Sequence, residues 1–150
     1  MVDELAIGLA DLGQDVYVIS PYYERNRKGE TGYLARDPAG IHYKDNLHVG
    51  IGSGFTLGVH EGVVQGVKLV FLHNGDIFPS AYPDALPPFL VTQIAVFSKA
   101  CLEFCCQRQI IPAVCVTNDW FTGLTAAYAK IGHFGETFKG TTFLHICHNL

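Results

Sequence analysis

Charged residues are scarce in this chain, since Asp, Glu, Lys and Arg together make up only 16% of its 150 residues. The formal net charge is −4, so the chain lacks the basic face with which proteins bind the phosphates of nucleic acids. It also lacks any run of about 18 uncharged apolar residues, the length that a membrane-spanning helix needs. We therefore expect neither nucleic acid nor a membrane among its partners.

The motifs of several common enzyme classes are also missing. Gly50, Gly52 and Gly54 resemble a dinucleotide-binding loop only superficially, because no helix is predicted to follow them. The sequence contains no phosphate-binding loop, no pair of histidines at zinc-ligand spacing and no Gly-x-Ser-x-Gly elbow. Hydride transfer, nucleotide hydrolysis by a phosphate-binding loop and serine hydrolysis therefore lack their usual residues here.

The five cysteines are an odd number without the paired two-residue spacing of common metal sites. Cys101 and Cys105 are one helical turn apart, whereas Cys115 and Cys147 lie within short apolar runs. Free cysteine behaves as a small apolar side chain. We therefore expect buried, reduced thiols, and a metal site is the alternative interpretation.

Hydrophobic residues make up 49% of the chain, and its length is that of one domain. The patterns predict helices at residues 1–12, 89–108 and 121–131, strands at 15–20, 113–117 and 141–147, hairpin strands within 47–73, and loops at 21–46 and 74–88. Strands alternate with helices in the second half, which is typical of a parallel sheet with helical crossovers. The sequence thus predicts an α/β fold.

Polar residues follow two of the predicted strands directly. Asn118, Asp119 and Trp120 come after one strand, and His148 and Asn149 come after the other. Ligands of open α/β sheets bind just beyond the carboxyl ends of the strands. Two such strand ends in one small domain therefore predict a functional site.

The residues alone leave their roles open. Asp119 could cap the helix that follows it, a role worth ~1 kcal/mol, or it could accept hydrogen bonds from sugar hydroxyls. Trp120 could contact a sugar ring or anchor the packing. His148 could bind a ligand or be a hydrogen-bonded histidine at a strand terminus.

Blocks along the whole chain resemble the N-terminal domain of bacterial-type glycogen and starch synthases. They comprise residues 5–23, 66–72, 97–103, 117–124 and 148–150. The most specific are Asn118-Asp119-Trp120 and the terminal His148-Asn149-Leu150. Phe121 departs from the family, which often has His or Gln there, and this puts one contact with the acceptor in doubt.

The resemblance implies a retaining glucosyltransferase with two Rossmann-like domains. Such enzymes transfer glucose from ADP-glucose or UDP-glucose to the non-reducing end of an α-1,4-glucan, without a metal ion or other cofactor. It implies a mostly parallel sheet with helices on both faces and a β-hairpin insertion. His148 and Asp119 would be the catalytic residues, and Asn149, Asn118 and Trp120 would bind substrate. His148 and Asp119 would position the sugar and stabilise its developing charge, not act as nucleophiles.

The resemblance also implies that residues 1–150 are a fragment, the acceptor-side domain without its first strand and without the C-terminal nucleotide-binding domain. Loss of a central strand would leave open edges at residues 16–19 and 67–72, or at 114–116, so we expect the fragment to self-associate or rearrange. We expect a cytoplasmic location, or a plastid in a plant-type source. Two alternatives are a non-catalytic glucan-binding or regulatory module and another sugar-nucleotide glycosyltransferase of the same architecture.

Overall fold

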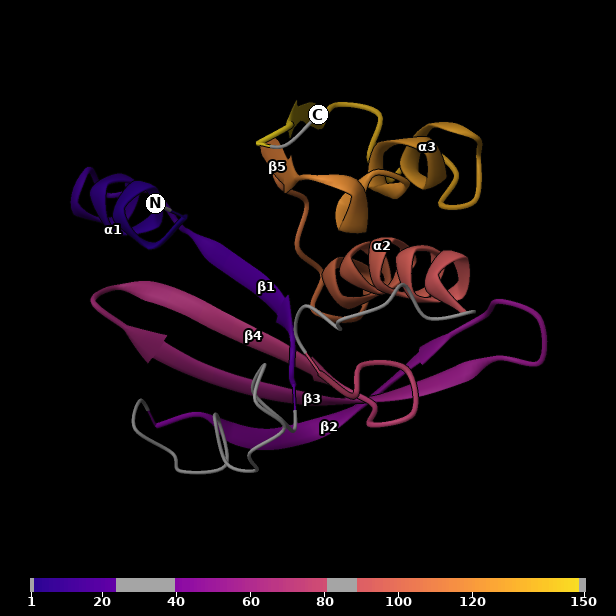
Figure 1. The fold of residues 1–150 in the computed structure, drawn as a ribbon. Coiled ribbons are helices and arrows are strands. Elements are labelled where there is room, and N and C mark those ends of the chain that lie inside the picture. Colours follow the sequence, from indigo (N-terminus) through magenta and orange to yellow (C-terminus); the bar gives the residue numbers. More distant parts are fainter. Residues whose placement is uncertain (1, 24–39, 81–88, 149–150) are drawn as a thin grey trace. The chain divides into compact units, whose positions relative to one another are not determined.

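The computed structural model describes residues 2–23, 40–80 and 89–148, and these ranges are the basis of every structural statement below. The elements are α1 (Val2–Asp11), β1 (Tyr17–Pro21), β2 (His42–Val49), β3 (Phe55–Val64), β4 (Val67–His73), α2 (Leu90–Gln107), β5 (Val114–Asn118), the 3-10 helix η1 (Trp120–Thr122), α3 (Thr125–Lys130) and β6 (Thr142–Ile146) (Figure 1). They belong to two compact units, Met1–Asn46 with Leu57–Ala85, and Leu47–Thr56 with Leu86–Leu150. The α/β class is confirmed.

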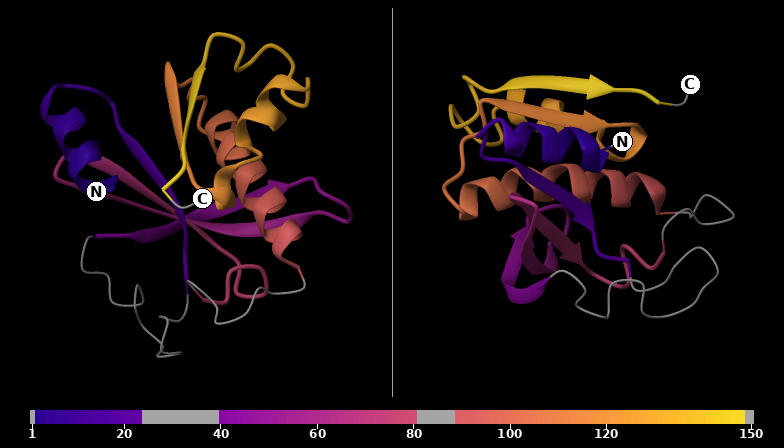
Figure 2. Two further views of the ribbon diagram at one scale, coloured as in Figure 1. Left: turned by 45° about the horizontal axis from the view of Figure 1, so that its top comes forward. Right: turned by 90° about the vertical axis from the view of Figure 1, so that its left-hand side faces the viewer.

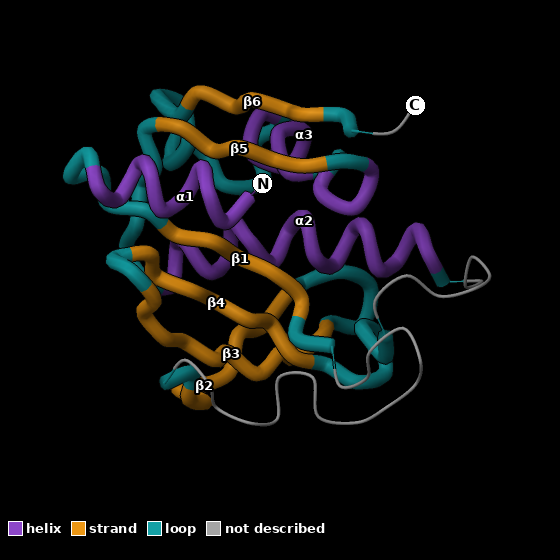
Figure 3. Tube along the Cα trace, turned by 60° about the vertical axis from the view of Figure 1, so that its left-hand side comes forward, coloured by secondary structure: helices purple, strands orange, loops and turns teal. Residues whose placement is uncertain are grey.

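A four-stranded sheet has the order β1-β4-β3-β2 (Figure 3). β1 runs parallel to β4, whereas β3 runs antiparallel to it. Side chains alternate across a strand, and Leu57 and Val59 on β3, with Val70 and Leu72 on β4, are buried by this alternation. The predicted strands and hairpin of this region are thus confirmed.

The C-terminal end of helix α1 is closed by backbone hydrogen bonds around Gly13. Gly13 has a φ of 80°, a left-handed conformation that glycine adopts without steric cost. The N–H of Gly13 donates to the carbonyl of Ala10, and the N–H of Gln14 donates to that of Leu9. This pair of hydrogen bonds is the Schellman motif that closes many helices.

Two predicted boundaries are wrong. Residues 42–46, predicted as loop, are the start of β2, whose side chains are mostly polar and exposed, so the alternation that signals a strand is missing. The helix predicted at 121–131 is divided into η1 and α3, because Gly123 closes a 3-10 turn onto the carbonyl of Trp120. Of the predicted loops, residues 24–39 and 81–88 lie outside the described residues.

The strands β5 and β6 form a separate two-stranded parallel sheet (Figure 2). Its register places Val116 opposite Leu144. One face packs through Phe143 on a cluster around the buried residues Leu102 and Phe138. On the other face Val114, Val116 and Leu144 are exposed. The strands predicted as one parallel sheet therefore form two sheets within the described residues.

The strand order of the two sheets tests the open edges predicted at residues 16–19, 67–72 and 114–116. In the part of the chain that the structure describes, β1 and β5 each end their sheet. β4 lies between β1 and β3, so the prediction that residues 67–72 form an edge is wrong. β4 is paired on both sides because the β3–β4 hairpin covers the side that β1 leaves free.

Candidate functional site

The carboxyl ends of β5 and β6 bring the two predicted polar segments together. Because the strands are parallel, they end at the same edge of the sheet, and their register places Asn118 opposite Ile146. The pairing extends one residue further, since the N–H of Asp119 donates to the carbonyl of Ile146 (2.8 Å). His148 follows two residues later and therefore lies beside Asn118 and Asp119.

Asp119 binds the backbone of His148 through its carboxylate. The N–H of His148 donates to Oδ1 of Asp119 at 2.6 Å, a short distance that is typical of a hydrogen bond to a charged acceptor. Asp119 occupies the N-cap position of η1, but its side chain makes no capping hydrogen bond. The carboxylate thus joins the two strand ends, and the helix-capping interpretation is not what the structure shows.

The backbone of Asp119 is held in an unusual conformation. Its φ is 52° and its ψ is −171°, close to a region that glycine alone populates readily, and such residues cost about 1–3 kcal/mol. The surroundings impose this geometry, because the N–H of Asp119 binds β6 while its carboxylate binds His148. Backbone strain of this kind is concentrated at functional sites.

The imidazole of His148 contacts the side chain of Asn118. Nε2 of His148 lies 3.2 Å from Oδ1 of Asn118, and the histidine is exposed. The backbone of Asn118 is itself fixed, since the hydroxyl of Thr122 donates to its carbonyl at 2.7 Å. Thr122 was missed by the sequence analysis, although a threonine in the first turn after a strand end is a recognisable hydrogen-bonding residue.

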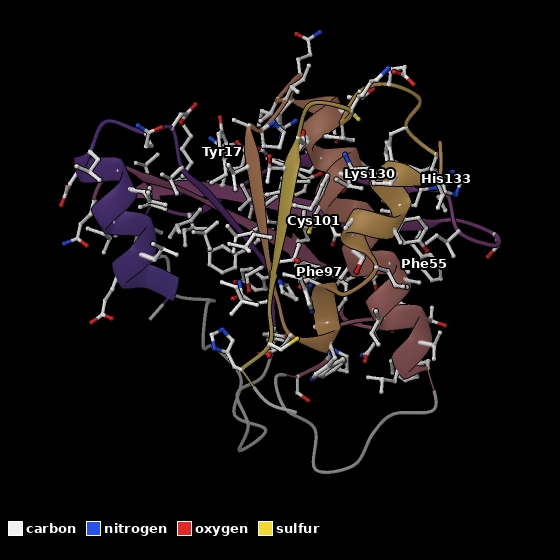
Figure 4. The ribbon with its side chains drawn as sticks, turned by 90° about the horizontal axis from the view of Figure 1, so that it is seen from above. Tyr17, Phe55, Phe97, Cys101, Lys130 and His133 are labelled. Carbon is white, nitrogen blue, oxygen red and sulfur yellow. The ribbon has the colours of Figure 1, made fainter. Side chains whose placement is uncertain are left out.

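Trp120 is anchored without being buried. The residue is 53% exposed, and its indole meets the ring of Phe121 edge-on with ring centroids 5.2 Å apart. Phe121 in turn lies against Phe97 with ring centroids 5.1 Å apart, and Phe97 is a residue of α2 (labelled in Figure 4). Phe121, where the family often has a polar residue, is thus a packing residue that supports Trp120. The remaining predicted site residue, Asn149, lies outside the described residues.

The five cysteines are free thiols, and four of them, Cys101, Cys105, Cys106 and Cys115, are partly buried. Burial raises the pKa of Cys101 well above its usual value, with smaller contributions from Cys115 and Cys105. Burial also raises the pKa of Cys105 to about 12 and that of Cys115 to about 11. Such thiols are protonated at neutral pH and are poor nucleophiles.

Cys147 differs from the other cysteines because it is exposed. The prediction of a buried thiol is wrong here, since β6 ends at Ile146 and Cys147 lies beyond the strand. The described residues contain no group of three His, Cys, Asp or Glu side chains that could hold a metal ion. No helix in the same ranges is long and apolar enough to cross a membrane.

Comparison with known proteins gives two further findings. Residues 1–150 match the family described as the starch synthase catalytic domain. The fold is similar to that of the catalytic domain of starch synthase IV from Arabidopsis thaliana, solved with ADP and acarbose bound, with a TM-score of 0.77 and 21% sequence identity over 97% of this chain. The chain spans 29% of the length of that structure. Because the family match extends over every residue, the chain belongs to the starch synthase catalytic domain family.

Proposed function

We propose that this chain is the acceptor-side part of a retaining glucosyltransferase, which transfers glucose from ADP-glucose or UDP-glucose to the non-reducing end of an α-1,4-glucan. The observation that carries the proposal is the polar cluster at the ends of β5 and β6, in a chain that matches the starch synthase family along its whole length. The nucleotide-binding domain would be supplied by sequence beyond these 150 residues. The similar plant structure was solved with ADP, which favours ADP-glucose of the two donors.

The chemistry explains why the cluster is suited to such a reaction. The bond between C1 of glucose and the diphosphate oxygen breaks, and its electron pair leaves with the diphosphate. A glucan hydroxyl oxygen forms the new bond to C1 on the same face, and its proton passes to the departing diphosphate. Positive charge develops on the sugar ring meanwhile, and fixed polar groups lower the energy of that state.

The residues of the cluster have separable roles in this scheme. The imidazole of His148 would contact a hydroxyl of the transferred sugar, and the carboxylate of Asp119 would keep the His148 backbone in place. The exposed indole of Trp120 offers an apolar ring face against which a sugar can pack. Asn149 stays a predicted substrate-binding residue.

A second candidate function is a non-catalytic glucan-binding or regulatory module. The observation that favours it is the exposed Trp120 beside the polar cluster, because an aromatic ring face next to polar groups is sufficient to bind a sugar. Binding of a glucan through Trp120 and Asp119 needs only the residues described above. Transfer needs a donor site as well.

One experiment separates the two functions. The complete transcript should be sequenced, its product expressed beside residues 1–150, and both incubated with glycogen and labelled ADP-glucose or UDP-glucose. We expect the complete product to label glycogen and the 150-residue chain to give no more label than a blank without protein. A complete product that binds glycogen in an affinity gel but transfers no glucose would support the binding module. Transfer by the 150-residue chain alone would show that it contains a full active site.

A further inference from the structure

The segment around β6 carries two histidines, each of which contacts a residue at the end of β5. His145 lies with its Nδ1 2.9 Å from the hydroxyl of Thr117, and His148 lies with its Nε2 3.2 Å from Oδ1 of Asn118. Successive side chains of a strand point to opposite faces, so Thr117 and Asn118 serve opposite faces of the sheet. The Asn118–His148 pair is therefore independent of the Thr117–His145 pair.

The backbones of both partners in the Asn118–His148 pair are fixed by other residues. Thr122 donates to the carbonyl of Asn118 at 2.7 Å, and Asp119 accepts from the N–H of His148 at 2.6 Å. What these bonds leave undetermined is the rotation of the exposed imidazole. Among the described residues, the contact with Asn118 is the interaction that holds the ring itself.

The chemistry of this contact determines where the histidine carries its proton. A carboxamide oxygen only accepts hydrogen bonds, so a ring nitrogen facing Oδ1 must be the protonated nitrogen. A neutral imidazole with its proton on Nε2 has an acceptor lone pair on Nδ1. Sugar hydroxyls are good donors to such a lone pair.

We infer that Asn118 is a positioning residue, which holds His148 with its proton on Nε2 and so presents Nδ1 as an acceptor for a hydroxyl group of the substrate. The inference deepens the proposed function. It rests on that function only for the identity of the substrate. It also reassigns Asn118, which the sequence suggested as a substrate ligand, to a role that acts through His148. Two neighbouring residues then position different parts of His148: Asp119 holds its backbone and Asn118 holds its ring.

The decisive test is the tautomer of His148, measured by 15N NMR of the complete enzyme labelled at its histidines. His148→Gln assigns the signal. At a pH where the ring is neutral, the parent chain should show proton occupancy on Nε2, with the two ring nitrogens well separated in chemical shift. In Asn118→Ala the two shifts should move toward each other as the tautomers mix. A parent ring with its proton on Nδ1, or an unchanged tautomer in Asn118→Ala, would overturn the inference.

Thr117→Val is the matched control, because it removes the partner of His145 and leaves that of His148. It should alter the shifts of His145 and leave those of His148 unchanged. Should Asn118→Ala not fold, Asn118→Asp keeps the shape and the acceptor oxygen. The added negative charge favours the doubly protonated ring, so both nitrogens of His148 should remain protonated to higher pH than in the parent chain. A His148 titration that does not respond to Asn118→Asp would exclude the contact.

Kinetics of the complete enzyme give a second readout. Asn118→Ala should lower kcat by less than the roughly 10²-fold expected for loss of the histidine itself, with KM for the donor little changed. Asn118→Asp should shift the acidic limb of the kcat/KM profile to higher pH and recover turnover above it. A large rise in KM without a change in tautomer would instead make Asn118 a substrate ligand. The NMR measurement uses no sugar, so its outcome is separate from whether the proposed reaction is correct.

Discussion

The backbone N–H of His148 and the carboxylate of Asp119 are joined by a hydrogen bond of 2.6 Å, across a separation of 29 residues in sequence. The bond closes the ends of β5 and β6 and sets the distance between the two polar segments. Asp119 adopts a positive φ to make it. Asp119 therefore carries both the backbone strain and the hydrogen bond. Substitutions at this position can separate the energetic effects of the two.

We expect Asp119→Gly to be more stable than Asp119→Ala. Both variants lose the carboxylate, but only glycine relieves the positive φ, so the difference in free energy of unfolding should be ~1 kcal/mol. Thermal or urea unfolding of the two variants measures it. Equal stability would show that the backbone relaxes once the carboxylate is removed.

The β3–β4 turn provides a control for this comparison. Gln65 also has a positive φ, of 49°, and it lies between the strand ends Val64 and Val67. Gln65→Gly should raise stability relative to Gln65→Ala, as at Asp119. In the complete enzyme, however, both Asp119 variants should lose activity, whereas the Gln65 variants should keep it.

His148→Ala should lower kcat of the complete enzyme by about 10²-fold or more, because removal of one preorganised polar contact to a transition state typically costs that much. Stability should change little, since His148 is exposed beyond the end of β6. His145→Ala is the matched control, because that ring contacts Thr117; its kcat should stay near that of the parent. Near-normal turnover of His148→Ala would make His148 a structural residue.

The elements that were predicted well are those in which apolar periodicity reflects burial. Helix α2 buries Phe97, Ala100 and Phe104, and their spacing was visible in the sequence. The first five residues of β2, 42–46, were missed because their polar, mostly exposed side chains give no alternation. Such an edge strand is set by pairing with its neighbour, which a single-sequence pattern does not contain.

The candidate site was found from the position of its residues but not from their contacts. Polar residues after two strands were enough to predict that Asn118, Asp119 and His148 lie together. Their hydrogen bonds depend on the register that places Asn118 opposite Ile146, and a shift of one residue would separate them. Register is a property of the tertiary structure, so the roles of Asp119 and Asn118 became visible only there.

The cysteines should react with a thiol reagent in two groups. At pH 8, the most rapid equivalent should come from Cys147, which is exposed, because a raised pKa lowers the thiolate fraction of the other four cysteines, Cys101, Cys105, Cys106 and Cys115. Cys147→Ser should abolish the rapid phase, whereas Cys115→Ser should leave it intact. A rapid phase that persists in Cys147→Ser would mean that a buried thiol is accessible in the folded chain.

The same thiols should make stability fall with rising pH. In the unfolded chain they ionise near a pKa of about 8.5, whereas in the folded chain burial raises the pKa of Cys115 to about 11 and that of Cys105 to about 12. The folded state therefore binds more protons above pH 8.5, and stability is lost from there upward. Urea unfolding between about pH 8 and 9.5 should show the loss, with a smaller slope in Cys115→Ala and an unchanged slope in Cys147→Ala. If the stability of Cys115→Ala fell with pH as steeply as that of the parent chain, the loss of stability would not come from ionisation of Cys115.

Self-association should occur through the open edge of β5. In the described residues β5 pairs with β6 alone, and the exposed Val114 and Val116 give this edge an apolar surface. Unpaired backbone N–H and C=O groups on such a strand pair readily with another chain, and a lysine on the edge opposes this pairing. We expect the 150-residue chain to form dimers or larger species at micromolar concentration, and Val116→Lys to shift it toward monomer.

Light scattering coupled to size-exclusion chromatography, over a range of concentrations, measures this change. Val63→Lys is the control, because Val63 is 63% exposed on β3, a strand that lies between β4 and β2 in its sheet. That variant adds the same charge without protecting an edge, so its association should match that of the parent chain. If both lysine variants reduced self-association equally, the reduction would be an effect of net charge and not of the β5 edge. A monodisperse parent monomer at every concentration would show that the edge of β5 does not recruit a second chain.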